Sequence, residues 1–238
     1  GWPGWWFTLA TVSGLAALAL MAWVPADPPR SSAHQRSWFQ RLSQVLSAAP
    51  PWWVALCFSV YSSQWLAVVG FMPTISHQMG WSAEFAGAAT AFVALVNVTG
   101  NVGSGHLLQR GWAAKRLLWL GFTCMASGAI LAFLDGAPVG LRCAGVLIFS
   151  ACGGLIPGTL FSMAVQLAPS EDTVSSTVGW VQQLSAVGQF VGPPLVAWVA
   201  AASGGWHYTG WVCAACSLVG MALAWRIHQS LLHKQRSA

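Results

Sequence analysis

The chain has 238 residues, of which 56% are hydrophobic and only 6% are charged, whereas soluble domains carry roughly 25% charged residues. So few charged side chains cannot cover a soluble globule of this size, and most of the surface is expected to face lipid. The composition excludes an ordinary soluble protein, a disordered chain, a disulfide scaffold and a nucleic-acid module.

Seven apolar segments are long enough to cross a bilayer, which takes about 20 residues each. They lack the alternating pattern of about ten residues that barrel strands show, so each predicts a helix. In chain order the predicted spans are 5–24, 52–72, 83–108, 117–134, 141–167, 174–201 and 208–225. The predicted fold class is all-α, a polytopic membrane helix bundle with seven transmembrane helices.

The connections between the spans are short except for one that holds Pro28, Pro29 and three arginines. The predicted organisation is therefore a first helix (1–24), a linker (25–49), a six-helix bundle (50–226) and a tail (227–238). An apolar segment that begins at once, with no Met and no basic leader before it, indicates that the chain starts within a longer protein.

Lys and Arg gather in alternate connections, as they do in the cytoplasmic loops of membrane proteins. The linker, the loop after the third span and the tail hold nine of the ten basic residues, and the opposite connections hold only Arg142. The N-terminus is thus predicted outside and the C-terminus in the cytoplasm, across the plasma membrane or, in a bacterium, the inner membrane. The net charge of +5 is then an orientation signal rather than a nucleic-acid footprint.

An offset of 88 residues places the third span on the sixth, with Gly100-Asn101 on Gly188-Gln189 and Asn97 on Ser185. The two spans run in opposite directions, which predicts a 3+3 inverted repeat within the last six helices. Such repeats, with a substrate site near the midplane between them, are typical of transporters.

Three spans carry polar stripes inside the membrane, where polar groups need partners or a water-filled cavity. Each amide could simply bond a neighbouring helix, but three stripes together favour a cavity. The predicted substrate-binding residues are Gln64 and Trp65 of the second span, Asn97 and Asn101 of the third, and Gln182 and Gln189 of the sixth.

Glycine and proline predict kinks in the fifth span, at GGLIPG (153–158), and in the sixth, at GPP (192–194). No predicted midplane holds Asp, Glu, Lys or Arg, and no catalytic or nucleotide-binding motif occurs. The C-x-x-C at Cys213 and Cys216 lies in a predicted span without a second pair, so it indicates helix packing. We therefore predict no enzyme activity, no cofactor and no metal.

The loop after the third span, GHLLQRGWAAKR at 105–116, resembles the loop motif G-x-x-x-D-R-x-G-R-R of the major facilitator superfamily. Gln109 stands where the family has Asp, and Trp112 where it has Gly. Residues 153–169 and 179–194 look like the tenth and eleventh helices of this family, closest to its cyanate and nitroimidazole transporter branch. The gating-loop residues implied by the motif are Gly105, Arg110, Lys115 and Arg116.

The resemblance implies that residues 1–24 are the sixth of twelve helices and that the rest is the linker and the C-terminal six-helix half of a secondary active transporter. Its implied cargo is a small polar or anionic organic solute, moved by alternating access, and proton coupling stays open. The implied partners are this small-molecule substrate, the lipid bilayer and the missing N-terminal half, with no nucleic acid. Two alternatives remain: a seven-helix receptor, and a membrane scaffold subunit that transports nothing.

Overall fold

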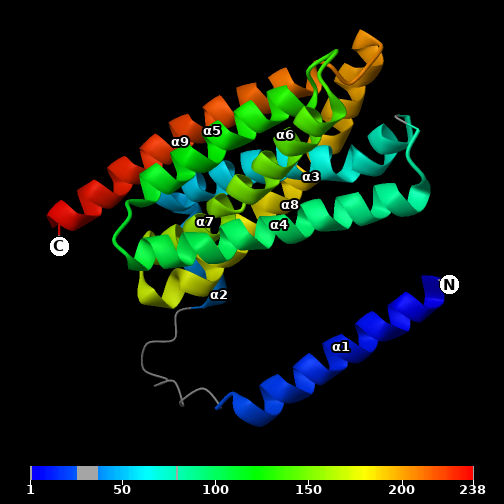
Figure 1. Ribbon diagram of the computed structural model, residues 1–238. Helices are drawn as coiled ribbons and strands as arrows, with labels where there is room; N and C mark the ends of the chain where they lie inside the picture. The colour runs from blue at the N-terminus through cyan, green and yellow to red at the C-terminus, as the bar shows by residue number, and fades with distance from the viewer. Residues whose placement is uncertain (1, 26–36, 79, 238) are drawn as a thin grey trace. The chain divides into compact units, whose positions relative to one another are not determined.

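The computed structural model describes residues 2–25, 37–78 and 80–237, and in these ranges every regular element is helical. The chain forms two compact units, Gly1–Ser37 and Trp38–Ala238, each of which is described by itself (Figure 1). The predicted linker prolines, Arg30 and Arg36 lie outside the described residues.

The first unit contains one helix, α1 (Trp2–Trp23), in which no residue is buried. Its hydroxyls are satisfied within the helix, because Thr8 and Thr11 donate to the carbonyls of Gly4 and Phe7 at 3.0 and 2.8 Å. A helix that is apolar on every side requires lipid or other apolar helices around it.

The second unit holds the remaining helices. They are α2 (Trp38–Ser47), α3 (Ala49–Gln78), α4 (Ala83–Gln109), α5 (Ala114–Ala132), α6 (Val139–Gly153), α7 (Leu155–Gln166), the 3₁₀ turn η2 (Glu171–Thr173), α8 (Val174–Ser203) and α9 (Thr209–Ser237). α2 lies within the segment 25–49, in which we predicted no membrane span. α9 extends to Ser237, into the segment 227–238 that we predicted as a tail, and the division of the chain into these parts stays a prediction.

Six helical segments in the described ranges are long and apolar enough to cross a membrane. They are Trp2–Trp23, Ala49–His77, Ala83–Gln109, Val139–Gln166, Glu171–Ser203 and Thr209–Arg236. α5, which covers the predicted fourth span, is not among them, and the count of seven spans therefore stays a prediction.

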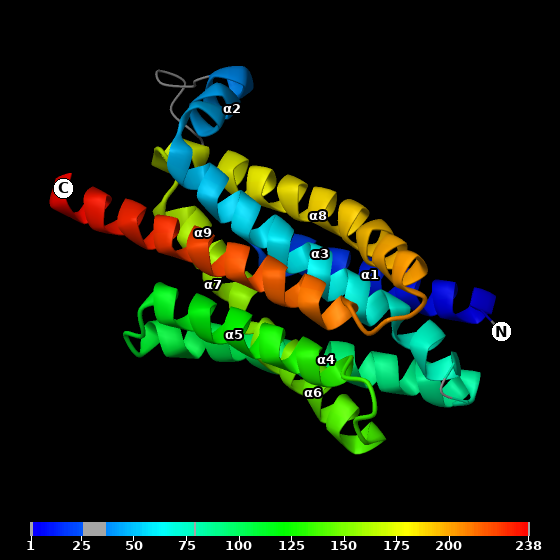
Figure 2. The same cartoon turned by 90° about the horizontal axis from the view of Figure 1, so that it is seen from above.

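Figure 2 shows from above how the helices of the second unit pack on one another. α3 packs mainly on α8 and α9, α5 on α6 and α9, and α4 on α6 and α7. The fully buried side chains between them include Phe122, Phe149 and Ile156.

Glycines bring two helix pairs into backbone contact. A Cβ on Gly100 of α4 would lie only 2.8 Å from the Cα of Gly154, and a Cβ on Gly188 of α8 only 2.8 Å from the carbonyl carbon of Ser59 in α3. Side chains larger than hydrogen do not fit at either crossing, which is the usual basis of close helix packing in membranes.

The two proline–glycine segments differ in their effect. The fifth predicted span is divided at Gly154, where α6 ends and α7 begins, as the sequence predicts. By contrast, α8 runs through Pro193 and Pro194 without interruption.

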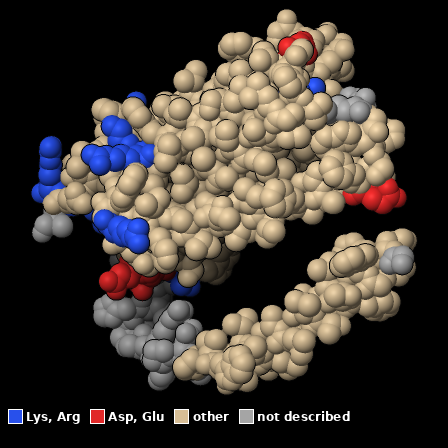
Figure 3. Space-filling view, in the orientation of Figure 1, with Lys and Arg blue, Asp and Glu red and all other residues tan. Residues whose placement is uncertain are grey.

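Basic side chains of the second unit gather at the end where α9 finishes (Figure 3). Lys115 lies over the rings of Trp225 and Trp119, at 3.9 and 4.7 Å from their centroids. Lys234, near the end of α9, donates to the carbonyls of Gln166 and Ala168 at 2.7 and 3.3 Å. This lysine thereby caps the C-terminus of α7, where a cation is favourable.

Candidate functional site

A cavity of about 180 Å³ lies where α3, α4, α7 and α8 meet. Its walls are formed by Phe58, Tyr61, Ser62 and Trp65 of α3, Asn97 of α4, Pro157 of α7, and Gln182, Ser185 and Gln189 of α8. These lining residues carry hydroxyls, amides and aromatic rings but no formal charge.

Four of the six predicted site residues line this cavity: Trp65, Asn97, Gln182 and Gln189. The other two do not. Gln64 faces α9, and Asn101 lies one turn along α4 from Asn97.

Asn97 is the best-anchored polar group of the cavity. Its side-chain nitrogen donates to the carbonyl of Ser150 at 2.8 Å and to the hydroxyl of Tyr61 at 3.2 Å. Its side-chain oxygen accepts from the amide nitrogen of Asn101 at 3.0 Å. Asn101 therefore fixes which way the amide of Asn97 points.

The α8 wall is held less tightly. The hydroxyls of Ser62 and Ser185 share a hydrogen bond of 2.6 Å, and the amide of Gln189 reaches Ser185 at 3.3 Å. Gln182 and Gln189 are both exposed within the second unit. An amide that is exposed on a membrane helix needs water, a ligand or another polar surface as its partner.

The indole nitrogen of Trp65 is buried and has no hydrogen-bond partner among the described residues. Trp65 is one of the residues that line the cavity. A buried N–H without a partner costs about 1–3 kcal/mol, so a bound molecule that accepted from this donor would remove that cost.

Gln64 is buried in the contact of α3 with α9 rather than in the cavity. Its side-chain oxygen accepts from the hydroxyl of Ser217 at 3.1 Å. Its nitrogen contacts the Val60 carbonyl one turn earlier at 3.4 Å. The stripe in the sequence placed Gln64 beside Trp65, but adjacent helical residues lie about 100° apart and face different neighbours.

The four predicted gating-loop residues lie at the junction of α4 and α5. Arg110 and Arg116 are exposed, and Gly105 has open space where a Cβ would be. Lys115 differs from both arginines because its ammonium is covered by two tryptophan rings.

Sequence reasoning missed Phe58 and Pro157 as lining residues. Their signal is weak, because an apolar residue in an apolar span does not reveal which neighbour it faces. Within the described ranges, no group of three or more His, Cys, Asp or Glu side chains is placed to hold a metal ion.

Comparisons with known proteins agree with this architecture. The sequence model described as "Major Facilitator Superfamily" matches residues 1–187 and, in a second overlapping match, residues 65–236. No curated protein sequence matches this chain.

Among solved structures, a variant of the E. coli fucose:proton symporter is similar with a TM-score of 0.75 and 17% identity, over 92% of this chain and 54% of that one. A second structure of that transporter, in the outward conformation, has a TM-score of 0.74, 18% identity and coverage of 92% and 53%. A mutant of the peptide transporter POT in complex with sulfate has a TM-score of 0.61 and 18% identity, over 84% and 41%. The chain thus spans about half the length of the symporter structures it matches.

Proposed function

Because the chain belongs to the Major Facilitator Superfamily, we propose that it forms the C-terminal half of a secondary active transporter that moves a small polar or anionic organic solute by alternating access. Family membership and the six apolar helical segments in the described ranges make it a multi-pass membrane protein. The chain covers 54% of the fucose:proton symporter. Five further helices would form the N-terminal half together with α1 as its sixth helix, and this half would supply the other wall of the solute path.

The observation that carries this proposal is the uncharged polar cavity with two exposed amides on its α8 wall. In a membrane, exposed Gln182 and Gln189 are costly unless a polar surface or an aqueous path faces them. A transporter places such a path between its two halves, whereas a receptor or a scaffold does not require one.

The roles of the site residues follow from their hydrogen bonds. Gln182 and Gln189 are the adaptable contacts, because their amides are not committed to strong bonds within the bundle. Asn97 and the Trp65 indole provide fixed donors or acceptors. Asn101 acts as a positioning residue for Asn97, and Gln64 ties α3 to α9.

The packing order supports the inverted repeat. α4 meets α6 and α7 through Gly100, and its predicted counterpart α8 meets α3 through Gly188. These two glycines are the pair aligned by the offset of 88 residues. In this scheme α5, the predicted fourth span, is the counterpart of α9 and brings the number of spans to seven.

The substrate is proposed to be small and uncharged or weakly anionic. A volume of about 180 Å³ without a charged side chain suits solutes of the kind handled by the cyanate and nitroimidazole branch. If transport is coupled to protons, the ionisable group would belong to the N-terminal half. Arg110 and Arg116, which are exposed, are the proposed gating contacts at the cytoplasmic end.

The test is uptake of small neutral amides and organic anions into proteoliposomes. The 238-residue chain should transport only when a five-helix N-terminal half is supplied. In the two-part protein, Gln182→Ala should reduce uptake, while Gln166→Ala, an equivalent change on exposed α7 surface, should not. Saturable uptake by the chain alone would refute the half-transporter, and equal uptake by both variants would refute the site.

A further inference from the structure

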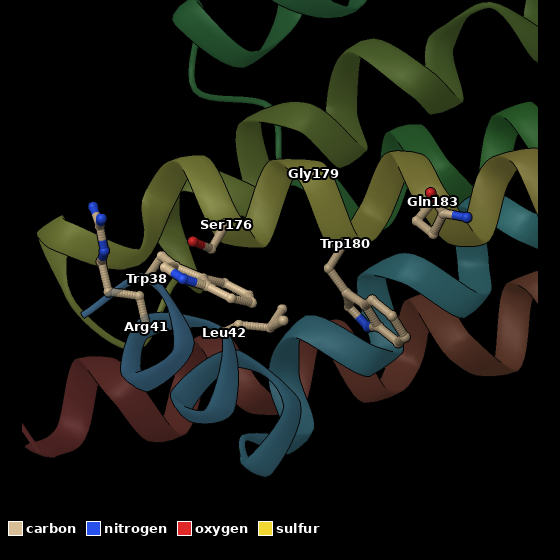
Figure 4. Close-up of a pocket in the computed structure, with 7 residues that line it drawn as sticks. All are labelled: Trp38, Arg41, Leu42, Ser176, Gly179, Trp180 and Gln183. Carbon is tan, nitrogen blue, oxygen red and sulfur yellow. The ribbon is translucent and has the colours of Figure 1, made fainter. Parts of the chain in front are cut away.

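A second hollow lies between α2 and the first turns of α8, outside the cavity described above. Its volume is about 450 Å³. Figure 4 shows the side chains of Trp38 and Leu42 projecting from α2 towards Ser176 and Trp180 of α8. We call this hollow the α2–α8 groove; Arg41 also contributes to its wall.

α2 is amphipathic and presents aromatic rings outward. Val45 is completely buried beneath the helix, whereas Trp38 and Phe39 are 68% and 65% exposed. Tryptophan and phenylalanine at the edge of a short amphipathic helix are typical of a segment that lies in the headgroup region of a bilayer. Since α3, a membrane-spanning candidate, begins directly after α2, α2 is held at that depth.

Two donors in the groove wall lack partners. The Nε of Arg41 and the Nε1 of Trp180 are both buried, and neither has a hydrogen-bond partner among the described residues. η2, which carries Glu171 and Asp172, packs on α2, but neither carboxylate accepts a hydrogen bond from the Nε of Arg41 in the described part of the chain. The groove therefore combines a guanidinium whose Nε has no partner, an indole donor without a partner and an apolar floor.

We propose that the α2–α8 groove binds the headgroup of an anionic phospholipid from the adjacent leaflet. Arg41 would contact the phosphate, with Trp180 and Ser176 as further donors, and Leu42 and Trp38 would pack on the glycerol and the first acyl carbons. A guanidinium suits this role, because its fork of N–H groups matches phosphate oxygens. The exposed rings of α2 favour a lipid over a soluble phosphate, since they place the groove within the bilayer interface.

The experiment is native mass spectrometry of the detergent-purified chain with mixtures of phosphatidylglycerol and phosphatidylcholine. The intact chain should retain one phosphatidylglycerol in preference to phosphatidylcholine by about fivefold, the effect of one basic residue near anionic lipid. Arg41→Gln should remove this preference. Arg236→Gln, the same change of charge at the exposed end of α9, should keep it.

Two further variants keep the proposal testable if Arg41→Gln disturbs folding. Trp180→Phe retains a ring against Trp52, whose centroid lies 4.7 Å away, and should weaken lipid retention because it removes only the N–H. Arg41→Lys should retain part of the preference. The proposal is overturned if Arg41→Gln keeps the full preference, if Arg236→Gln loses as much, or if excess inorganic phosphate displaces the lipid.

Discussion

Replacement of Gly188 by alanine should separate α8 from α3. A Cβ at this position would lie 2.8 Å from both the carbonyl carbon and the Oγ of Ser59, and closer still to the carbonyl oxygen. Ordinary van der Waals contact starts at 3.4 Å. Two of the three atoms belong to the α3 backbone, so no side-chain rotation removes the clash and one helix must shift. Overpacking of this kind costs about 1–3 kcal/mol.

The measurement is the free energy of unfolding of the purified chain in mixed detergent and SDS micelles, followed by circular dichroism. The matched control is Gly179→Ala on the same helix, where a Cβ would meet nothing within 4 Å. This control should be neutral or more stable by up to about 1 kcal/mol, because alanine is the better helix former. The same sequence change should thus be destabilising at one position and neutral or stabilising at another that lies nine residues away in α8.

The result that would refute this reasoning is a Gly188→Ala protein as stable as Gly179→Ala. α8 would then have room above Ser59, and the backbone contact of α3 with α8 would not exist in solution. Gly100→Ala gives an independent check, since its Cβ would meet the backbone of Gly154 at 2.8 Å. It should destabilise the chain by a similar amount.

Three further tests use other substitutions. Gln189→Ala should change the free energy of unfolding by no more than about 0.5 kcal/mol, since this exposed amide has one long hydrogen bond. It should nevertheless lower solute uptake by the two-part protein. Normal uptake would show that the polar stripe only serves helix packing. Gln64→Leu should destabilise the chain by about 1–3 kcal/mol, because the buried hydroxyl of Ser217 loses its acceptor. The double variant with Ser217→Ala should recover part of this loss. If the losses of stability of the two single variants simply added in the double variant, the pairing would be contradicted. In a chain without native cysteines, Gly205→Cys should react with an impermeant maleimide added outside the membrane, and Glu171→Cys only with reagent added inside. Labelling of both positions from one side would exclude the proposed orientation.

The helices of this chain follow closely from its sequence, because a bilayer demands long apolar segments whose backbone is satisfied internally. The predicted span 83–108 and the helix Ala83–Gln109 agree almost to the residue, helped by the N-cap Ser82, whose side chain accepts from the Phe85 N–H. The break in the fifth span was also predictable, since two glycines precede a proline there.

The site was predictable only in part. Helical spacing placed Asn97 and Gln189 on polar faces, and both line the cavity. It could not separate Gln64 from Trp65, because which of two neighbouring residues meets the cavity depends on the rotation of α3 about its axis. That rotation is set by the contacts of Gly188 and Gly192 with the α3 backbone, which are not apparent from the sequence of α3.

The amphipathic helix α2 was missed for a different reason. It has only 10 residues and lies in a connection rich in proline and serine, so a search for apolar segments of about 20 residues passes over it. Its signal is the periodic placement of Leu42, Val45 and Leu46, which appears only when the linker is examined for helical periodicity on its own.

The cap that Lys234 forms on α7 has a practical consequence for handling the protein. Because its ammonium satisfies the carbonyls of Gln166 and Ala168, a chain truncated before Lys234, or trimmed there by a protease, would leave these carbonyls without that cation. A purification tag placed directly after Arg236 would crowd the same region, whereas a spacer between the helix and the tag would leave the cap intact. Trimming of this basic end should therefore loosen not only α9 but also the last turn of a different helix, α7.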